Sequence, residues 1–430
     1  MPDFSGAQFS LLATNSLGAS NSPSAVLTVL NPFNSAFTSN IWTLLPGARS
    51  YTSIGAYLER GMAYNPVSGN LIIATRNIGD FVVAINGQTD QEMNYLDTTG
   101  VAGGTFDINM VGASDDGAIY VGNLTTAATT SPYILYRWPD DSGVGATVAF
   151  SGDPGGSSFP GLRWGDSIAV RGSGPTTQVL LAPGFATNNI VSLLQTTDGT
   201  HFQAFPIQFD TPSTHTTPEG LTFGPGTNTF YLKIVGALLI LVQFDATSGT
   251  GFVQHSYSLG AVPGSVTAIG YSPSLKLLAG LDSSAVPQLV SVFSVADSTQ
   301  DPVIEDQKSF PSSNSNPQYG GLGAVVFGPG YLWVADSNNG IQGFQINTNY
   351  PAVTPFSITQ LAATEGGLPL LTWQTQPGHM YQALGKNSVT ATNWFPVGAA
   401  ALAGGTTLSV TNYYLPGASA GQRFYHVRGF

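Results

Sequence analysis

The chain has 430 residues, of which 8% are charged, and its 24 Asp and Glu outnumber its 12 Lys and Arg to give a formal charge of −12. This balance argues against nucleic acid as a partner, and the scattered basic residues argue against an anionic membrane surface. The chain contains no cysteine, so disulfides and Cys-based zinc sites are excluded. Its 52 Gly and 28 Pro favour many short strands, and therefore an all-β fold.

The first segment, residues 1–32, contains two alternating apolar runs around a Ser-Leu-Gly-Ala turn at 16–19. It resembles the last two strands of an immunoglobulin-like domain, so we expect a partial immunoglobulin-like hairpin. A lone hairpin is marginal in water. We therefore expect it to dock on the rest of the chain, to stay mobile, or to self-associate by adding strands to another copy.

Residues 33–350 repeat one unit, in which a β-rich run, a turn and a second β-rich run follow one another. The six copies begin about 45 to 60 residues apart, a spacing typical of four-stranded propeller blades. They occupy residues 61–76, 108–123, 168–184, 220–236, 268–283 and 323–337. We predict a β-propeller with six blades, or seven if a long insert hides another.

Each copy is followed by an apolar run that can supply a third strand, and most are followed by a fourth, but the sixth lacks the outer strand. The strand-like segment 40–46 has no local partner. We predict that it completes the last blade, because this pairing closes the ring and removes open sheet edges. The longest apolar run, 234–244, is about half a membrane span, so we expect no membrane insertion.

Four acidic residues lie at or just before the first strand of a repeat: Glu59, Asp107, Asp166 and Glu219. The first strands of propeller blades line the central channel, so these side chains are expected to converge on one mouth. Oxygen ligands of this kind suit Ca²⁺ or another divalent cation. The pattern is similar to hydrolytic and lactonase-type propellers, which implies a cation that activates water, with His215 as a possible general base.

The alternative for these carboxylates is solvation or pairing with Arg60 and Arg163. Two other acidic stretches, Asp115-Asp-Gly and Asp140-Asp-Ser, resemble fragments of calcium loops, but we interpret them as hairpin turns because the remaining ligand spacing is absent. The abundant aromatic residues suit either sugar stacking at an exposed face or packing between blades.

The last segment, residues 351–430, is predicted to be a small β-sandwich-like module. It contains a Leu-Thr-Trp strand at 371–373, a Pro-Gly-x-x-Tyr strand at 377–381, an Asn-Trp turn at 393–394 and an Arg-Phe-Tyr-x-Val ending at 423–427. These motifs resemble C-terminal modules of large exported proteins from environmental bacteria of the Verrucomicrobia and Planctomycetes type. The central ring resembles propeller domains of the same proteins.

The resemblance implies an extracellular or cell-surface location. The N-terminus has no signal peptide, so we expect the chain to be a fragment of a longer exported protein. Two functions are expected. The first is a propeller scaffold for binding or surface assembly with a glycan, polymer or protein ligand, and the second is a divalent-cation-dependent hydrolase of lactones, esters or phosphoesters.

Overall fold

The computed structural model describes residues 37–347 except 78, 185–188, 211–217, 235 and 317–322, the backbones of four short strands before residue 27, and parts of 357–429. Apart from one 3₁₀ turn, every regular element among these residues is a strand, which confirms the all-β prediction. No helix in this part of the chain is long and apolar enough to span a membrane. The chain divides into two compact units, residues 36–350 and a second unit that combines 1–35 with 351–430.

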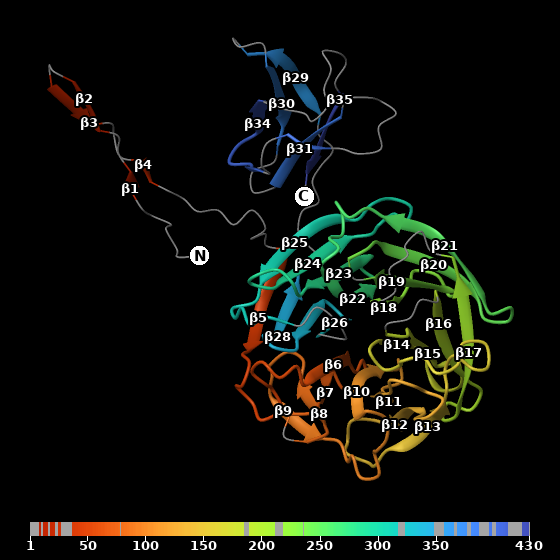
Figure 1. The fold of residues 1–430 in the computed structure, drawn as a ribbon. Coiled ribbons are helices and arrows are strands. Elements are labelled where there is room, and N and C mark those ends of the chain that lie inside the picture. Colours follow the sequence, from red (N-terminus) through yellow and green to blue (C-terminus); the bar gives the residue numbers. More distant parts are fainter. Residues whose placement is uncertain are drawn as a thin grey trace. The chain divides into compact units, whose positions relative to one another are not determined.

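The larger unit contains six successive groups of four antiparallel strands, called repeats 1 to 6 here (Figure 1). Repeat 1 comprises β6 (Glu59–Tyr64), β7 (Asn70–Thr75), β8 (Phe81–Asn86) and β9 (Glu92–Tyr95), and repeat 2 comprises β10 (Phe106–Ala113), β11 (Ile119–Leu124), β12 (Tyr133–Trp138) and β13 (Thr147–Gly152). Repeat 3 comprises β14 (Ile168–Arg171), β15 (Gln178–Leu181), β16 (Ile190–Thr196) and β17 (Phe202–Phe209), and repeat 4 comprises β18 (Pro218–Phe223), β19 (Thr229–Ile234), β20 (Leu239–Asp245) and β21 (Thr250–Tyr257). Repeat 5 comprises β22 (Val266–Ser272), β23 (Leu277–Asp282), β24 (Leu289–Ser294) and β25 (Val303–Ser309), and repeat 6 comprises β26 (Gly323–Gly328), β27 (Tyr331–Asp336), β28 (Gly340–Ile346) and β5 (Thr38–Leu44).

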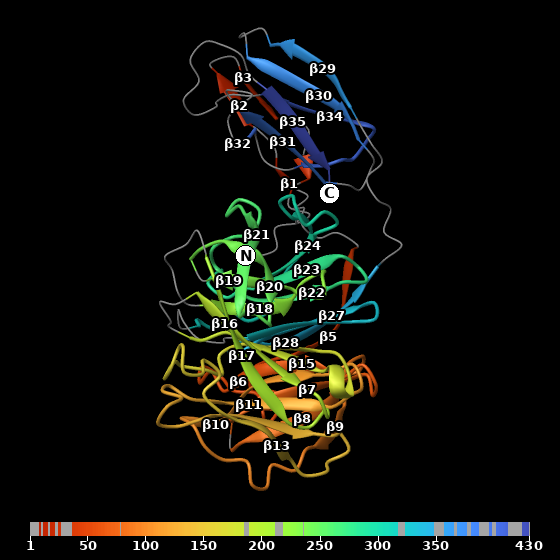
Figure 2. The same ribbon diagram turned by 90° about the vertical axis from the view of Figure 1, so that its right-hand side faces the viewer.

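The first strands of the repeats, β6, β10, β14, β18, β22 and β26, are the inner strands of a ring. Each contacts the next, and β26 contacts β6, so the ring is complete. The segment expected to close it is β5, which pairs antiparallel with β28 from Thr38↔Ile346 to Leu44↔Ile341. Figure 2 shows the same strands from the side of the ring.

Hydrogen bonds at the closure tie β5 and repeat 6 to their neighbours. The indole nitrogens of Trp42 and Trp333 both donate to the carbonyl oxygen of Gly87, at 2.8 and 2.7 Å. Thr38 donates its backbone N–H and its hydroxyl to one carboxylate oxygen of Asp306. The two indoles therefore join repeat 6 to repeat 1 at a single buried acceptor, and Thr38 joins β5 to repeat 5.

Glycines allow neighbouring inner strands to approach closely. A Cβ built on Gly61 would lie 2.5 Å from the backbone nitrogen of Val111, and one on Gly112 would lie 2.3 Å from Cγ2 of Val170. Real Cβ atoms do not approach other atoms this closely. The neighbouring inner strands can therefore approach each other this closely only because these positions have no side chain.

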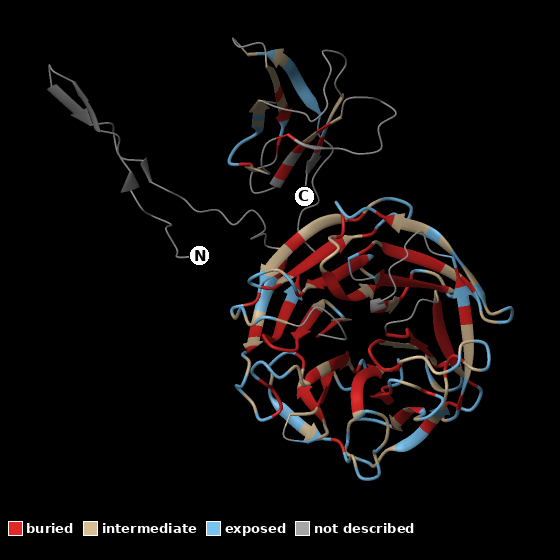
Figure 3. Cartoon of the chain, viewed as in Figure 1, coloured by how far each residue is buried: buried red, intermediate tan, exposed pale blue. Residues whose placement is uncertain are grey.

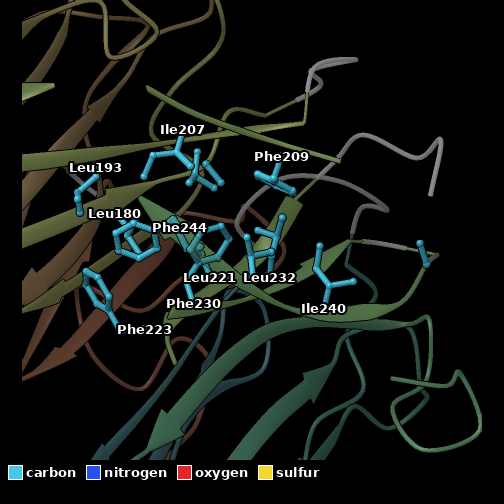
Figure 4. Close-up of a cluster of buried hydrophobic side chains, with 14 residues drawn as sticks. Leu180, Leu193, Ile207, Phe209, Leu221, Phe223, Phe230, Leu232, Ile240 and Phe244 are labelled. Carbon is cyan, nitrogen blue, oxygen red and sulfur yellow. The ribbon is translucent and has the colours of Figure 1, made fainter. Parts of the chain in front are cut away.

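The second and third strands of the repeats, such as β7, β11 and β16, are almost fully buried, whereas outer strands such as β9 and β13 are largely exposed (Figure 3). Apolar side chains from facing repeats form the core, as Figure 4 shows for Leu180, Leu193 and Ile207 of repeat 3 against Phe230 and Phe244 of repeat 4. The sequence did not predict that the outer strands of these repeats, β17 and β21, also pair in parallel and join the two repeats into one eight-stranded sheet.

The smaller unit contains two short pairings near the N-terminus, β1 (Gln8–Phe9) with β4 (Ala25–Val26) and β2 (Leu12–Asn15) with β3 (Gly18–Asn21). Its C-terminal part has one sheet of β29 (Ile358–Ala363), β30 (Pro369–Gln374) and β34 (Thr407–Thr411). A second sheet contains β31 (Met380–Lys386), β32 (Phe395–Pro396), β33 (Ala401–Leu402) and β35 (Phe424–Gly429). Leu371 and Trp373 of one sheet and Tyr381 and Val427 of the other belong to one buried cluster.

Candidate functional site

The ring has two mouths, which we name after the inner strands: the amino-terminal mouth where these strands begin and the carboxyl-terminal mouth where they end. The predicted acidic site lies at the first. Glu59 begins β6 and is 6% exposed. Its carboxylate accepts hydrogen bonds from the backbone N–H of Ser53 and, at 2.7 Å, from the Ser53 hydroxyl. Burial raises the pKa of Glu59.

Asp166 precedes β14 and is 2% exposed. Its carboxylate forms a bidentate ion pair with Arg163, with 2.8 Å between Nη2 and Oδ1. Hydrogen bonding to Asp166 raises the pKa of Arg163. The carboxylate is thus neutralised by the arginine that the sequence analysis named as its alternative partner.

Asp107 lies near the start of β10 and is half-buried. Its Oδ1 accepts the backbone N–H of Gly103 at 2.8 Å. Burial, followed by the charge of Asp107, raises the pKa of nearby Asp80. Arg76 stacks over the ring of Phe106, 3.7 Å from Cζ to the ring centroid.

The backbone of Glu219 lies in β18, but its side chain and the whole of His215 lie outside the described residues. Among the residues that the structure does describe, no three His, Asp or Glu side chains come together in a way that could hold a metal ion. Ligation of a divalent cation by Glu59, Asp107, Asp166 and Glu219 therefore stays a prediction.

The two calcium-loop fragments are turns, as predicted. Asp115 and Asp116 lie between β10 and β11, and their carboxylates accept the backbone N–H groups of Gly172 and Gly174 at 3.0 and 2.8 Å. Asp140 follows β12 and accepts the backbone N–H of Ser142 at 2.8 Å. These acidic side chains fix turns or link neighbouring repeats.

The carboxyl-terminal mouth opens into a cavity of about 540 Å³ that all six inner strands line. This volume is in the range of small-molecule sites. The lining consists largely of the second halves of the inner strands and includes small residues such as Ala63, Gly112 and Ala169. The cavity is therefore a feature that all six repeats build jointly.

The residues at one equivalent position of the six repeats surround this cavity. This position is the last or next-to-last residue of each inner strand and faces the start of the second strand in the antiparallel register. The six residues, in repeat order, are Tyr64, Ala113, Arg171, Phe223, Tyr271 and Phe327. Four of the six are aromatic, and of these four all but Phe223 are partly exposed.

The aromatic members of this ring are held by contacts to the preceding repeat. Tyr64 stacks on Trp333, with 4.9 Å between ring centroids and 17° between planes. Tyr271 meets Tyr231 edge-on at 5.2 Å. Such geometry fixes the orientation of the rings. The side chains at the mouth are therefore positioned before any ligand arrives.

The hydroxyls of Tyr64 and Tyr271 make no hydrogen bond to any residue that the structure describes. Burial raises the pKa of both phenols, so both hydroxyls stay protonated at neutral pH. They are thus available as donors and acceptors at the edge of the cavity.

The sequence analysis missed this ring of residues, although a signal for it exists. In the four repeats with an aromatic residue at this position, a proline follows two residues later, at Pro66, Pro225, Pro273 and Pro329. An alignment of the six repeats on this aromatic-x-Pro pattern would have shown that the position recurs at one level of the ring.

Residues 28–194 match a family described as a domain of unknown function (DUF4623). The matched stretch includes β5, repeats 1 and 2, and most of the first three strands of repeat 3. No curated protein matches the chain.

Proposed function

We propose that the chain is a non-catalytic, exported binding protein whose ring is a six-bladed β-propeller, and that a glycan binds at the carboxyl-terminal mouth. The C-terminal unit is, in this proposal, an accessory β-sandwich-like module of the same scaffold. The low content of charged residues agrees with a protein that works outside the cell.

One observation carries this proposal: the equivalent position at the end of the inner strand is aromatic in four repeats, at Tyr64, Phe223, Tyr271 and Phe327. Aromatic faces pack well against the C–H faces of sugar rings, while hydroxyls at the rim can bond to sugar hydroxyls. Each ring side chain comes from a different repeat, so a single ligand can contact several repeats at once.

The hydrolase alternative is less well supported at the other mouth. A cation there would have to compete with Ser53 for the Glu59 carboxylate and with Arg163 for the Asp166 carboxylate. Breaking a buried pair of this kind costs several kcal/mol, about 3–5, because the remaining charge loses its partner.

The proposal is tested by a glycan array followed by calorimetric titration of the best ligand. The variants Tyr64→Ala and Tyr271→Ala should each weaken binding about tenfold or more, because burial of a large apolar side chain contributes on the order of 1.5–3 kcal/mol. Phe252→Ala is the matched control. Phe252 lies on the outer strand β21, is 57% exposed and should leave binding unchanged.

A silent array, together with turnover of a lactone, ester or phosphoester that depends on a divalent cation, would favour the hydrolase instead. The loss of that turnover in Glu219→Gln, but not in Tyr271→Ala, would place the activity at the amino-terminal mouth.

A further inference from the structure

Two charged side chains line the described part of the cavity, Asp115 and Arg171, and both are held by the protein itself. Arg171 donates from Nε and Nη2 to the side-chain oxygen of Gln178, at 2.9 and 2.8 Å. It also donates to the backbone carbonyls of Gly226, at 3.2 Å, and Thr227. These bonds leave the guanidinium with little capacity for a ligand.

The position of Arg171 indicates a different role. Its Cζ lies 3.9 Å from the ring centroid of Phe223, the aromatic residue at the equivalent position of the next repeat. Arg171 therefore braces Phe223 and is a positioning residue. Asp115 likewise accepts the backbone N–H of Gly172 at 3.0 Å, which ties repeat 2 to repeat 3.

An anionic ligand would consequently find one cation among the described residues of the cavity, Arg171, whose donors are already largely engaged. Burial of an unpaired charge is strongly unfavourable. An anionic ligand would also approach a chain with a formal charge of −12. The accessible neutral hydroxyls of the lining include those of Tyr64, Tyr271, Thr222 and Thr227, and partly exposed aromatic faces line the same cavity.

We infer that the ligand of the carboxyl-terminal mouth is a neutral saccharide, bound by aromatic packing and by the hydroxyls of Tyr64 and Tyr271. This inference rests on the proposed function and specifies its ligand. It assigns the aromatic rings to contact with the sugar faces and the two phenols to hydrogen bonds with sugar hydroxyls.

The test compares neutral glucose-based di- to tetrasaccharides with their counterparts oxidised at C6 to uronic acids, by calorimetric titration at 25 and 250 mM NaCl. We expect the neutral series to bind at least tenfold more tightly than the acidic series. We also expect its affinity to change less than twofold with salt, because no charge is neutralised on binding.

Tyr64→Phe and Tyr271→Phe separate the two contributions, because they keep the ring and remove the hydroxyl. Each should weaken binding of the neutral saccharide about three- to tenfold, which is the effect of one lost hydrogen bond. Tyr95→Phe is the matched control, since Tyr95 is an exposed tyrosine of β9 outside the cavity.

Tight, salt-dependent binding of the uronic series would overturn the inference of a neutral ligand and leave the binding function intact. Unchanged affinity in both Tyr→Phe variants would overturn the role of the phenols. If no saccharide of either series binds and the glycan array is also silent, the proposed function itself fails.

Discussion

At the scale of a single residue, Gly61 shows that the close packing of the inner strands restricts which residues these strands can contain. It lies on β6 where the backbone of β10 passes within 2.5 Å of the place that a Cβ would occupy. The obstructing atoms are Val111 N and Met110 Cα, which belong to the backbone and cannot rotate away. A methyl group at this point must therefore push two inner strands apart.

We predict that Gly61→Ala lowers the free energy of unfolding of the ring by about 1–3 kcal/mol, the usual effect of overpacking. Denaturant-induced unfolding followed by tryptophan fluorescence measures this change. Gly260→Ala is the control, since the nearest atom to its Cβ is the Ser258 hydroxyl at 3.8 Å. Equal stability of the two variants would show that the inner strands move apart without cost.

The residues of the candidate site differ in how far the sequence could predict them. The sequence placed Glu59, Asp107 and Asp166 near the starts of inner strands, and the structure has them there. The Arg163 partner of Asp166 was among the alternatives that the sequence offered, whereas the Ser53 partner of Glu59 depends on a short loop, and such a detail carries no periodic signal. The aromatic position that recurs at the carboxyl-terminal mouth does carry a periodic signal.

At the scale of the element, the pairing of β5 with β28 depends on more than its backbone ladder. Gly87 is buried at the end of β8, and its carbonyl oxygen accepts from two indoles of repeat 6, Trp42 and Trp333. If one indole is lost, the other still satisfies this acceptor. If both are lost, a buried carbonyl has no partner from either side chain.

This redundancy predicts non-additive stability effects. Trp42→Phe and Trp333→Phe should each be destabilising, and the double variant should lose more than the sum of the two, by about 1–3 kcal/mol for the unsatisfied carbonyl. A double-mutant cycle by chemical denaturation measures this coupling. Strict additivity would mean that water or another group replaces the indoles.

The sequence predicted the elements better than their unusual pairings. β-rich runs separated by turn residues marked the strands of the repeats, and the unpaired run at 40–46 corresponds to β5. The parallel contact between β17 and β21 involves two residue pairs, Gln208↔Thr250 and Phe209↔Gly251. It depends on how far two outer strands reach across a gap between repeats, and no local pattern encodes that distance.

At the scale of the whole molecule, buried carboxyl groups make the stability of the ring dependent on pH. Burial raises the pKa of Glu59 and of Asp336 above their ordinary values. A carboxyl whose folded-state pKa is raised contributes stability that is fully present below the unfolded pKa, about 4, and is lost as the pH rises through the folded value.

We therefore predict that the wild-type chain loses stability relative to Glu59→Gln over the pH range above about 4, the ordinary pKa of a carboxyl, because the glutamine does not ionise. Unfolding free energies of both proteins across this range measure the effect. Asp198→Asn is a control of opposite sign. Hydrogen bonds from His201 lower the pKa of Asp198, so its contribution is lost as the pH falls. A difference between wild type and Glu59→Gln that is constant with pH would contradict the prediction.

The strand that completes repeat 6 also sets an order of events during synthesis. β5 is the first strand of the ring to leave the ribosome, and its partner β28 is the last. Until β28 has been made, β5 exposes an edge without its native partner, and repeats 1 to 5 can stack only as an open arc. Closure of the ring is thus the last step of its folding, and the nascent arc is the state most exposed to misassembly with another chain.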